Sequence, residues 1–275
     1  FADYLAVYAN AGFDTTEVLS FFEAWTSSLS YTLQLYFDFS GYTDMALGSA
    51  LMFNIKLPIN FNSPYKSINI QEFWRRWHIT LSRFMRDYVY IPLGGNQVSE
   101  SKILFNLFLT FLIGGLWHGA GWTFVFWGFI HGVAIIIYRL WKMLNVSMPK
   151  ALAWFITFNF VNIAWVFFRA KSWESALNVL RGMFGVNGVT LPETILLKLK
   201  FLGTLGIGTG VTMMSLKIAI PMILIAMVLS TLFKNSNEML AKYKPTVSYM
   251  IMTGVIFLIS VLHMSKYSEF LYFRF

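Results

Sequence analysis

The chain of 275 residues has no cysteine and few charged residues. Without cysteine it cannot form disulfide bonds, a thiolate nucleophile or a metal site built on thiolates. Charged residues make up 12% of the sequence, where soluble domains have about 25%, and hydrophobic residues make up 57%. Its long apolar runs lack the alternation that is typical of the strands of a membrane barrel. The composition therefore predicts an all-α integral membrane protein.

Several cofactor and metal motifs are also missing. No H-E-x-x-H pattern and no closely spaced cluster of histidines and carboxylates is present, so we expect no metal site. The glycine-rich stretch 203–210 lacks the Lys-Ser/Thr ending of a phosphate-binding loop, and we expect no tightly bound cofactor. The net charge of +8 is distributed between apolar runs, which favours contact with lipid headgroups and argues against a nucleic-acid partner.

Apolar segments long enough to cross a membrane recur along the chain, because about 20 helical residues suffice. The expected spans are 27–56, 102–117, 121–141, 151–168, 216–233 and 247–265. The segment 192–212 is ambiguous, because Lys198 and Lys200 oppose a span and its glycines weaken a helix. Residues 1–26 mix carboxylates with aromatic residues and are expected to form a short surface or interfacial segment.

Two segments combine charge with helical periodicity, which predicts amphipathic helices that lie in the interface or re-enter the protein. They are 68–90 and 172–185. Within the first, five apolar residues share one helical face: Phe73, Trp77, Leu81, Phe84 and Tyr88. Arg83 can pair with Asp87 because the two are one helical turn apart, and the same spacing relates Glu72 to Arg76.

Two carboxylates, Asp38 and Asp44, stand six residues apart in the first expected span. A charged group at membrane depth is costly and marks a candidate functional site. Two interpretations are open. The carboxylates lie near the interface, where they cap helix ends or pair with arginine, or they line a polar cavity.

His118 is the principal candidate for catalysis, because it lies among glycines and tryptophans in an apolar segment. A histidine can take or give a proton near neutral pH. Gly119 beside it lets backbone or substrate approach closely. From periodicity alone, a core histidine bonded to a neighbouring helix explains His118 equally well.

The other histidines have more ordinary explanations. His78 lies in the segment 68–90, either at the interface or in a cavity, and its arginine neighbours are expected to lower its pKa. His131 cannot share a site with His118 on one straight helix, unless glycines break that helix, and is expected to be structural. His263 is assigned to the membrane interface.

Three blocks together, 74–82, 86–96 and 115–120, resemble the membrane-bound O-acyltransferases. Within that family they are most similar to the bacterial alginate O-acetyltransferase branch, which includes proteins of peptidoglycan and other polysaccharide O-acetylation. The stretches 37–46 and 269–275 are similar to that branch too.

The resemblance implies a multi-span helical core in a bacterial cytoplasmic (inner) membrane, with 1–275 as a single membrane domain. Family members are usually longer, and the first residue of the chain is Phe1 and not a methionine. We therefore expect a C-terminal fragment from which the N-terminal helices of the family are absent.

The resemblance also implies that His118 is the essential histidine of the family and that His78 is its second polar position near the cavity. The hypothesis is transfer of an acetyl group to a hydroxyl, with His118 as general base. The donor would be acetyl-CoA or a related thioester. N–H groups near Gly119, the Trp117 indole or His78 would stabilise the oxyanion.

Five further residues are predicted to contact donor or substrate: Arg75, Arg76, Asp38, Asp44 and Asp87. The arginines, with Arg83, would hold donor phosphates at the membrane surface, although interfacial anchoring explains them nearly as well. The family implies a relay across the membrane. Its partners are lipids, the acyl donor, and a periplasmic protein that acetylates an exported polysaccharide such as alginate.

Two alternatives remain open beside a weaker third, a structural membrane subunit. The first is a transporter or channel with a polar path lined by Asp38, Asp44 and His118. It predicts two related halves with broken helices, and the sequence shows no such symmetry. The second is a lipid-directed acyltransferase of the same superfamily, which would need a wide entrance facing the lipid.

Overall fold

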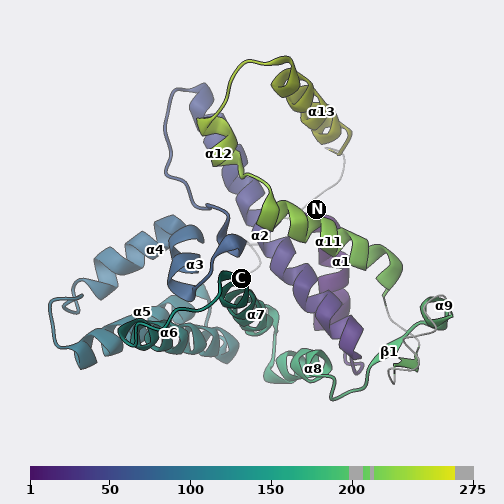
Figure 1. Cartoon of the computed structure of the whole chain (residues 1–275), viewed down its shortest axis with the longest axis horizontal. Helices are drawn as coiled ribbons and strands as arrows, with labels where there is room; N and C mark the ends of the chain where they lie inside the picture. The colour runs from purple at the N-terminus through teal and green to yellow at the C-terminus, as the bar shows by residue number, and fades with distance from the viewer. Residues whose placement is uncertain (198–206, 211–213, 264–275) are drawn as a thin grey trace.

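The computed structural model describes residues 1–197, 207–210 and 214–263 and is built mainly of helices (Figure 1). Its longer helices are α1 Ala2–Phe13, α2 Phe21–Met52, α5 Glu100–His118, α6 Trp122–Met143, α7 Lys150–Arg169, α8 Trp173–Met183, α11 Leu216–Leu232 and α13 Val247–His263. Its shorter elements are η1 Pro64–Lys66, α3 Ile70–Arg76, α4 Ile79–Met85, η2 Arg86–Tyr90, β1 Thr190–Leu191, α9 Glu193–Leu196, β2 Gly208–Thr209 and α12 Ser236–Ala241. The predicted all-α fold class is confirmed.

Three helices, α5, α6 and α7, are long and apolar enough to cross a membrane. They coincide with the spans expected at 102–117, 121–141 and 151–168. The 32-residue helix α2 covers most of the first expected span. The helices α11 and α13, of 17 residues each, are apolar and match the last two expected spans, as far as the structure describes them.

The ambiguous segment 192–212 contains no spanning helix in its described part. Helix α9 covers only four residues, and β2 pairs with β1 in parallel. Lys198, Lys200 and Gly203 lie outside the described residues, as does the closing stretch 269–275.

Residues 1–26, expected to be a short surface or interfacial segment, contain helix α1 and the start of α2. Leu5, Ala9 and Phe13 recur at helical spacing and are buried, so α1 packs against α2 along a full face (Figure 1). Helix α2 begins where the Glu23 carboxylate accepts hydrogen bonds from the backbone N–H of Ser20 at 3.1 Å and from its hydroxyl at 2.7 Å. This capping box fixes the start of the helix.

The amphipathic segment 68–90 is not one helix. It divides into α3, α4 and the π-helical turn η2, with a break between α3 and α4 at Trp77 and His78. His78 has left-handed backbone angles, φ 41° and ψ 57°. Because of the break, the apolar residues that periodicity placed on one face do not share a surface. Phe73 and Trp77 are buried, whereas Tyr88 is 71% exposed.

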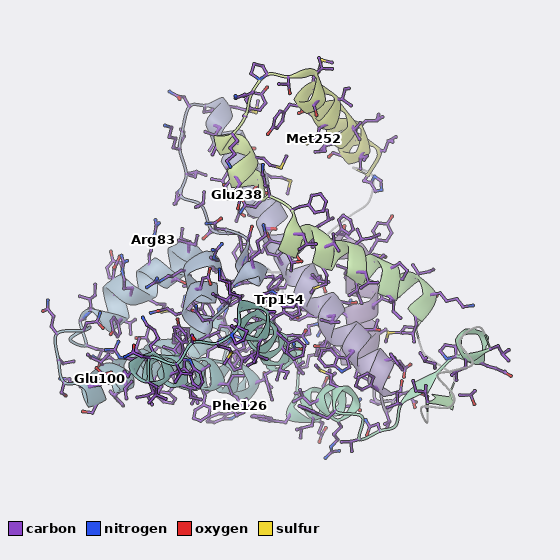
Figure 2. All side chains as sticks on the ribbon, viewed as in Figure 1. Arg83, Glu100, Phe126, Trp154, Glu238 and Met252 are labelled. Carbon is purple, nitrogen blue, oxygen red and sulfur yellow. The ribbon has the colours of Figure 1, made fainter. Side chains whose placement is uncertain are left out.

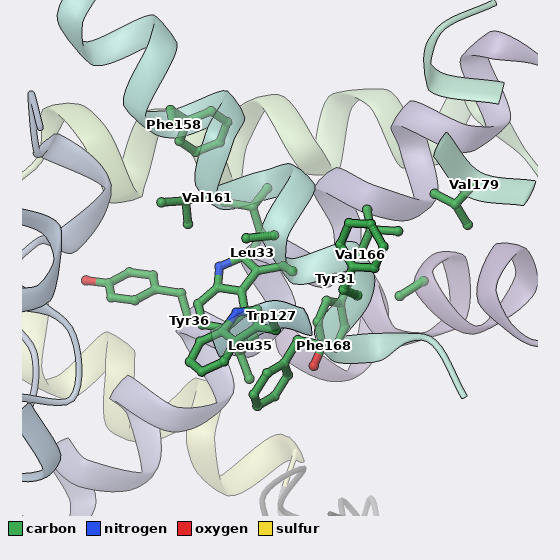
Figure 3. Packing of buried hydrophobic residues seen from close by; sticks show 14 of the residues in the cluster. Tyr31, Leu33, Leu35, Tyr36, Trp127, Phe158, Val161, Val166, Phe168 and Val179 are labelled. Atoms are coloured by element: carbon green, nitrogen blue, oxygen red, sulfur yellow. The ribbon is translucent and has the colours of Figure 1, made fainter. Parts of the chain in front are cut away.

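Helices α2 and α7 are joined in the core by polar side chains as well as aromatic ones. The side-chain oxygen of Asn162 accepts hydrogen bonds from the hydroxyls of Ser28 at 3.0 Å and Thr32 at 2.7 Å. Polar bonds of this kind hold helices together where lipid provides no hydrophobic driving force. Figure 3 shows the surrounding cluster, in which Trp127 of α6 lies among buried residues of α2 and α7.

The second predicted amphipathic segment, 172–185, forms helix α8. Its buried residues are Ala176, Val179, Gly182 and Met183. The apolar spacing in the sequence predicts a buried face of Trp173, Ala176, Leu177, Leu180 and Phe184. Trp173 is instead 41% exposed and Phe184 72% exposed, so the buried face is rotated from the predicted one.

Candidate active site

A cleft of about 880 Å³ lies between α4 and η2 on one side and α5 and α6 on the other. Figure 2 shows Arg83 on α4 and Glu100 at the start of α5 on these two sides. The lining runs from Tyr138 and Lys142 of α6 to His118 at the end of α5. The cleft therefore connects a charged outer part with the principal candidate residue.

The outer part of the cleft is basic. Its lining includes five cationic side chains, those of Arg75, Arg83, Arg86, Arg139 and Lys142. Glu100, the one carboxylate among the described lining residues, accepts a hydrogen bond from Nη2 of Arg139 at 2.9 Å. Guanidinium groups donate paired hydrogen bonds to phosphate oxygens, so this surface suits a phosphate-bearing molecule.

His118 is the last residue of α5, because Gly119 takes an extended conformation with φ 166° and ψ 162°. A Cβ atom at Gly119 would come within 2.8 Å of the Phe124 ring, so only glycine fits there without movement. The His118 ring lies between aromatic neighbours, with ring centroids 4.9 Å from Phe168 and 5.3 Å from Trp127. These contacts hold the imidazole at the inner end of the cleft.

A second, smaller cavity of about 20 Å³ adjoins the cleft and brings His78 and His118 together. Its other lining residues are Leu35, Phe39, Trp74, Trp77, Leu81, Trp127, Trp165 and Phe168. A space of this size accommodates about one water molecule or a methyl-sized group. The two histidines expected to share a site thus line one enclosed apolar space.

His78 is held by Asn60, which lies 18 residues earlier in the chain. The Asn60 side-chain oxygen accepts hydrogen bonds from the Thr80 hydroxyl at 2.6 Å and the Thr80 N–H at 3.2 Å, and Nδ1 of His78 lies 3.3 Å from it. Because a backbone N–H can only donate, this Asn60 atom is an acceptor, which assigns the proton of His78 to Nδ1. Nε2 of His78 is then unprotonated and can accept a proton or a hydrogen bond.

Burial lowers the pKa of His78 from 6.5 to about 4. The predicted direction of the pKa shift is therefore confirmed, although its main cause is burial and not the neighbouring arginines. With the proton assigned to Nδ1, Nε2 of His78 has no hydrogen to donate, so the expected role of His78 as an oxyanion donor would need the other tautomer.

Glycines bring α5 and α6 into close contact beside the site. A Cβ atom at Gly128 would lie 2.5 Å from the Phe111 carbonyl oxygen, and one at Gly115 would lie 2.4 Å from the Phe124 carbonyl oxygen. Small residues at these positions let the two backbones approach. The hairpin α5–α6 therefore places Trp127 directly beside His118.

His131 lies closer to the site than one straight helix would allow, because the chain breaks between His118 and Trp122 and turns back. The Trp127 ring is 4.8 Å from His131, so it separates the two histidines. His131 is fully buried, and its Nδ1 accepts a hydrogen bond from the Trp74 indole at 3.2 Å. It lines neither space.

The structure leaves several predicted contact residues outside both spaces. Arg76 pairs with Glu72 at 2.7 Å, as expected, and points away from the cleft that Arg75 lines. Asp87 pairs with its neighbour Arg86 at 2.7 Å and not with Arg83, which corrects the predicted pair. The turn η2 replaces the α-helical spacing on which that pair depended.

The carboxylates of α2 also lie outside both spaces. Asp44 is exposed and accepts a hydrogen bond from the Ser236 hydroxyl at 2.9 Å. Asp38 is half-buried, and neither residue belongs to the described lining of the cleft or the cavity. The polar path of a transporter, which required both carboxylates beside His118, is therefore not formed by these residues.

The Gly119 N–H and the Trp117 indole, the two other expected oxyanion donors, do not point to a shared site. The Gly119 N–H donates to the Leu116 carbonyl oxygen at 3.3 Å. Trp117 is 50% exposed, and although its ring contacts His118 it lines neither space.

Several lining residues were not anticipated from the sequence. Arg139 and Lys142 lie at the end of the expected span 121–141, and their three-residue spacing is visible in the sequence, but no motif marks them as site residues. Trp127 and Ser82 gave no pattern that distinguishes them from core residues. The return of α6 along α5 brings Trp127 to the cleft, whereas Ser82 lines it from α4.

Comparison with known sequences adds to this geometry. A sequence model of the membrane-bound O-acyltransferase family matches residues 3–176. The chain is 51% identical to a peptidoglycan O-acetyltransferase of Helicobacter pylori, over 100% of this chain and 53% of the relative.

Two other relatives match part of the chain. A probable alginate O-acetylase AlgI of Azotobacter vinelandii is 48% identical over 62% of this chain and 34% of the relative. A teichoic acid D-alanyltransferase of Bacillus subtilis is 35% identical over 51% of this chain and 40% of the relative. The chain thus spans about half the length of these curated relatives, or less.

Proposed function

Because the chain belongs to the membrane-bound O-acyltransferase family, we propose that it carries the reaction centre of an enzyme that transfers acetyl groups to a hydroxyl, as a step in the O-acetylation of a cell-envelope polysaccharide. The observation that carries the proposal is the position of His118. This one imidazole borders both the basic cleft and the small apolar cavity that contains His78.

The chemistry follows from the properties of a neutral imidazole. A hydroxyl is a poor nucleophile until a base removes its proton during attack. In the proposed step the hydroxyl oxygen bonds to the carbonyl carbon of a thioester, while His118 takes the hydroxyl proton. The C–S bond then breaks, and His118 returns the proton to the departing sulfur. Such acid–base assistance contributes about 10²- to 10⁴-fold to a rate.

His78 has a distinct part in this proposal. Its assigned tautomer leaves Nε2 unprotonated, and its ring lines the small cavity. Nε2 can therefore accept a hydrogen bond from the incoming hydroxyl and orient its oxygen toward the thioester. Orientation of this kind lowers the entropic part of the barrier.

The basic cleft is the proposed site of the donor, acetyl-CoA or a related thioester. Its phosphates would lie against the arginines of the outer part, and the thioester would reach His118 at the inner end. The Arg75 and Arg83 side chains lie on the same side of the cleft, and Arg139 and Lys142 lie on α6. No tightly bound cofactor or metal is part of the proposal.

The preferred final acceptor is peptidoglycan. The relative named for peptidoglycan matches the whole chain, whereas the relatives named for alginate match 62% to 70% of it. We further propose a bacterial inner-membrane location with several spans, and a periplasmic partner protein that passes the acetyl group to the polymer. The three helices long and apolar enough to cross a membrane and the bacterial relatives support the proposed location.

The test compares bound O-acetyl in the envelope polysaccharide of cells that carry the full-length protein as wild type, His118→Ala or His263→Ala. His263, exposed at the end of α13, is the matched control histidine. We expect acetylation to disappear in His118→Ala and to persist in His263→Ala, with equal amounts of all three proteins in the membrane. Acetylation at the wild-type level in His118→Ala would overturn the assignment of the base.

A further inference from the structure

Four residues line both the cleft and the small cavity and so form the wall between them: Trp74, Leu81, His118 and Trp127. The carbonyl group of the acyl donor must lie at this wall if His118 serves the attacking hydroxyl. The negative charge that develops on its oxygen needs a hydrogen-bond donor within reach. Apart from His118, only the two tryptophans of this wall can donate with their side chains.

The indole of Trp74 is already engaged. Its N–H donates to Nδ1 of the fully buried His131 at 3.2 Å. The His131 ring is also packed against Trp74, with centroids 5.1 Å apart. Trp74 therefore has no further N–H to offer to a substrate.

The indole of Trp127 is different. Its side chain is 2% exposed, and its N–H has no hydrogen-bond partner among the described residues. A buried donor without an acceptor costs about 1 to 3 kcal/mol, so such groups are rare in folded proteins and often mark a functional site. The Trp127 ring is 5.3 Å from the His118 ring, at an interplanar angle of 87°.

Packing holds this indole in one orientation. It stacks on Trp165 at 5.7 Å with an angle of 19° and meets the edge of Phe168 at 5.1 Å. Gly128, the next residue, locks α6 against α5. A donor fixed in advance in an apolar surrounding stabilises charge without reorganisation during the reaction.

The other N–H groups near the site do not compete for this role. The Gly119 N–H donates to Leu116, and the proton on Nδ1 of His78 faces Asn60. The Trp165 indole N–H also has no hydrogen-bond partner among the described residues, but Trp165 borders only the small cavity and is not part of the wall. Trp127 is thus the one donor at the wall between the two spaces whose acceptor is missing among the described residues.

We propose that Trp127 is a catalytic residue whose indole N–H donates a hydrogen bond to the carbonyl oxygen of the acyl group. As the hydroxyl oxygen bonds to the carbonyl carbon, the π electrons of the C=O bond move to this oxygen, and the N–H stabilises the resulting negative charge. When the intermediate collapses, an electron pair on this oxygen re-forms the C=O bond, and the electrons of the C–S bond leave with the sulfur, which takes the proton from His118. This role rests on the proposed acetyl transfer.

The experiment uses envelopes from cells that carry the full-length protein, with acetyl-CoA as donor; the partner protein and the polysaccharide of the envelopes receive the acetyl group. Trp127→Phe keeps an aromatic ring and removes the N–H. We expect kcat to fall about 10²- to 10³-fold with KM changed less than threefold, because the hydrogen bond forms mainly in the transition state.

A second variant separates the N–H from the shape of the ring. Incorporation of 3-benzothienylalanine at position 127 replaces N–H by sulfur and keeps the bicyclic ring, so the same loss of kcat is expected. Trp154→Phe is the matched control. It removes an indole hydrogen bond to the Tyr65 carbonyl oxygen, 2.8 Å long, in a residue that lines neither space.

The outcomes are distinct. A kcat within threefold of wild type in Trp127→Phe, or in the benzothienyl variant, overturns the role of the N–H. An equal fall of kcat in Trp154→Phe also overturns it, because loss of packing then explains the effect. Equal rates for wild type and His118→Ala would overturn the proposed acetyl transfer, and the role of Trp127 with it.

Discussion

His78 connects the protonation of one side chain to the stability of the fold. Its ring is packed edge-on against Phe39 at 4.9 Å, and burial lowers its pKa to about 4, whereas an unfolded chain has about 6.5. Between these values the unfolded chain binds more protons, so stability is present above pH 6.5 and is lost as the pH falls toward 4.

We predict that His78→Asn weakens this pH dependence. Asparagine tolerates the left-handed backbone of position 78 and does not titrate. Between pH 6.5 and 5.0 the wild type should lose about 1 to 2 kcal/mol more stability than the variant. Thermal unfolding of both proteins in detergent at the two pH values measures the difference. Equal losses in the two proteins would show that His78 is not held neutral by burial.

At this scale the sequence predicts some site residues and misses others. Adjacent arginines illustrate the limit: Arg75 lines the cleft, whereas Arg76 pairs with Glu72. Neighbours on a helix differ by about 100° in direction, but only the packed structure tells which direction faces the cleft. A missing acceptor at Trp127 leaves no trace in a sequence at all.

At the scale of secondary structure, the helix break at His78 is the clearest difference from expectation. Apolar periodicity continues through 68–90, so nothing in the segment itself marks the break. The side chain of Asn60 provides the bonds that stabilise the turn, from a loop that precedes the segment. Helix α1 was not predicted, because the carboxylates and aromatic residues of 1–26 obscure the helical spacing of Leu5, Ala9 and Phe13.

The contact between α5 and α6 gives a prediction for one glycine. A Cβ atom at Gly128 would lie 2.5 Å from the Phe111 carbonyl oxygen, which cannot move without moving α5. Gly128→Ala should therefore destabilise the protein by about 1 to 3 kcal/mol and lower activity, because it separates Trp127 from His118.

The matched control is Gly48→Ala on α2, where a Cβ atom would meet nothing within 4 Å. Alanine in an open helical position should be neutral or stabilising, by about 1 kcal/mol at most. Thermal unfolding and transfer rates of both variants measure the contrast. A Gly128→Ala protein as stable as wild type would mean that the two helices can separate at little cost.

At the scale of the whole molecule, we expect the cationic side chains of the basic cleft to increase the affinity of the enzyme for acetyl-CoA. Arg83→Gln is predicted to raise KM for acetyl-CoA about 3- to 10-fold, because a charge-assisted hydrogen bond to phosphate is lost. The effect on kcat should be less than twofold. Higher salt should raise KM of the wild type more than that of the variant.

Arg181→Gln is the control for total charge, since Arg181 is exposed on α8 and outside the described lining of the cleft. Initial rates over a range of acetyl-CoA concentrations give KM for the three proteins. An equal increase of KM in both variants would indicate a general effect of surface charge and not a donor site.

The sequence predicts the large-scale architecture better than the site. Composition and apolar length correctly predict a helical membrane protein and the positions of α5, α6 and α7. The assignment of 1–275 to one membrane domain stays a prediction. The cleft depends on the return of α6 along α5 and on the break between α3 and α4, and both arise from contacts between distant segments.

His118 belongs to the walls of both the cleft and the small cavity, and this has a consequence for bioenergetics. In the proposed reaction the proton taken from the hydroxyl is returned to the sulfur, and the thiol product keeps it at neutral pH. No net proton enters from, or leaves to, the water on either side. Each turnover would neither consume nor dissipate a transmembrane proton gradient, so collapse of that gradient should leave the transfer step at the same rate.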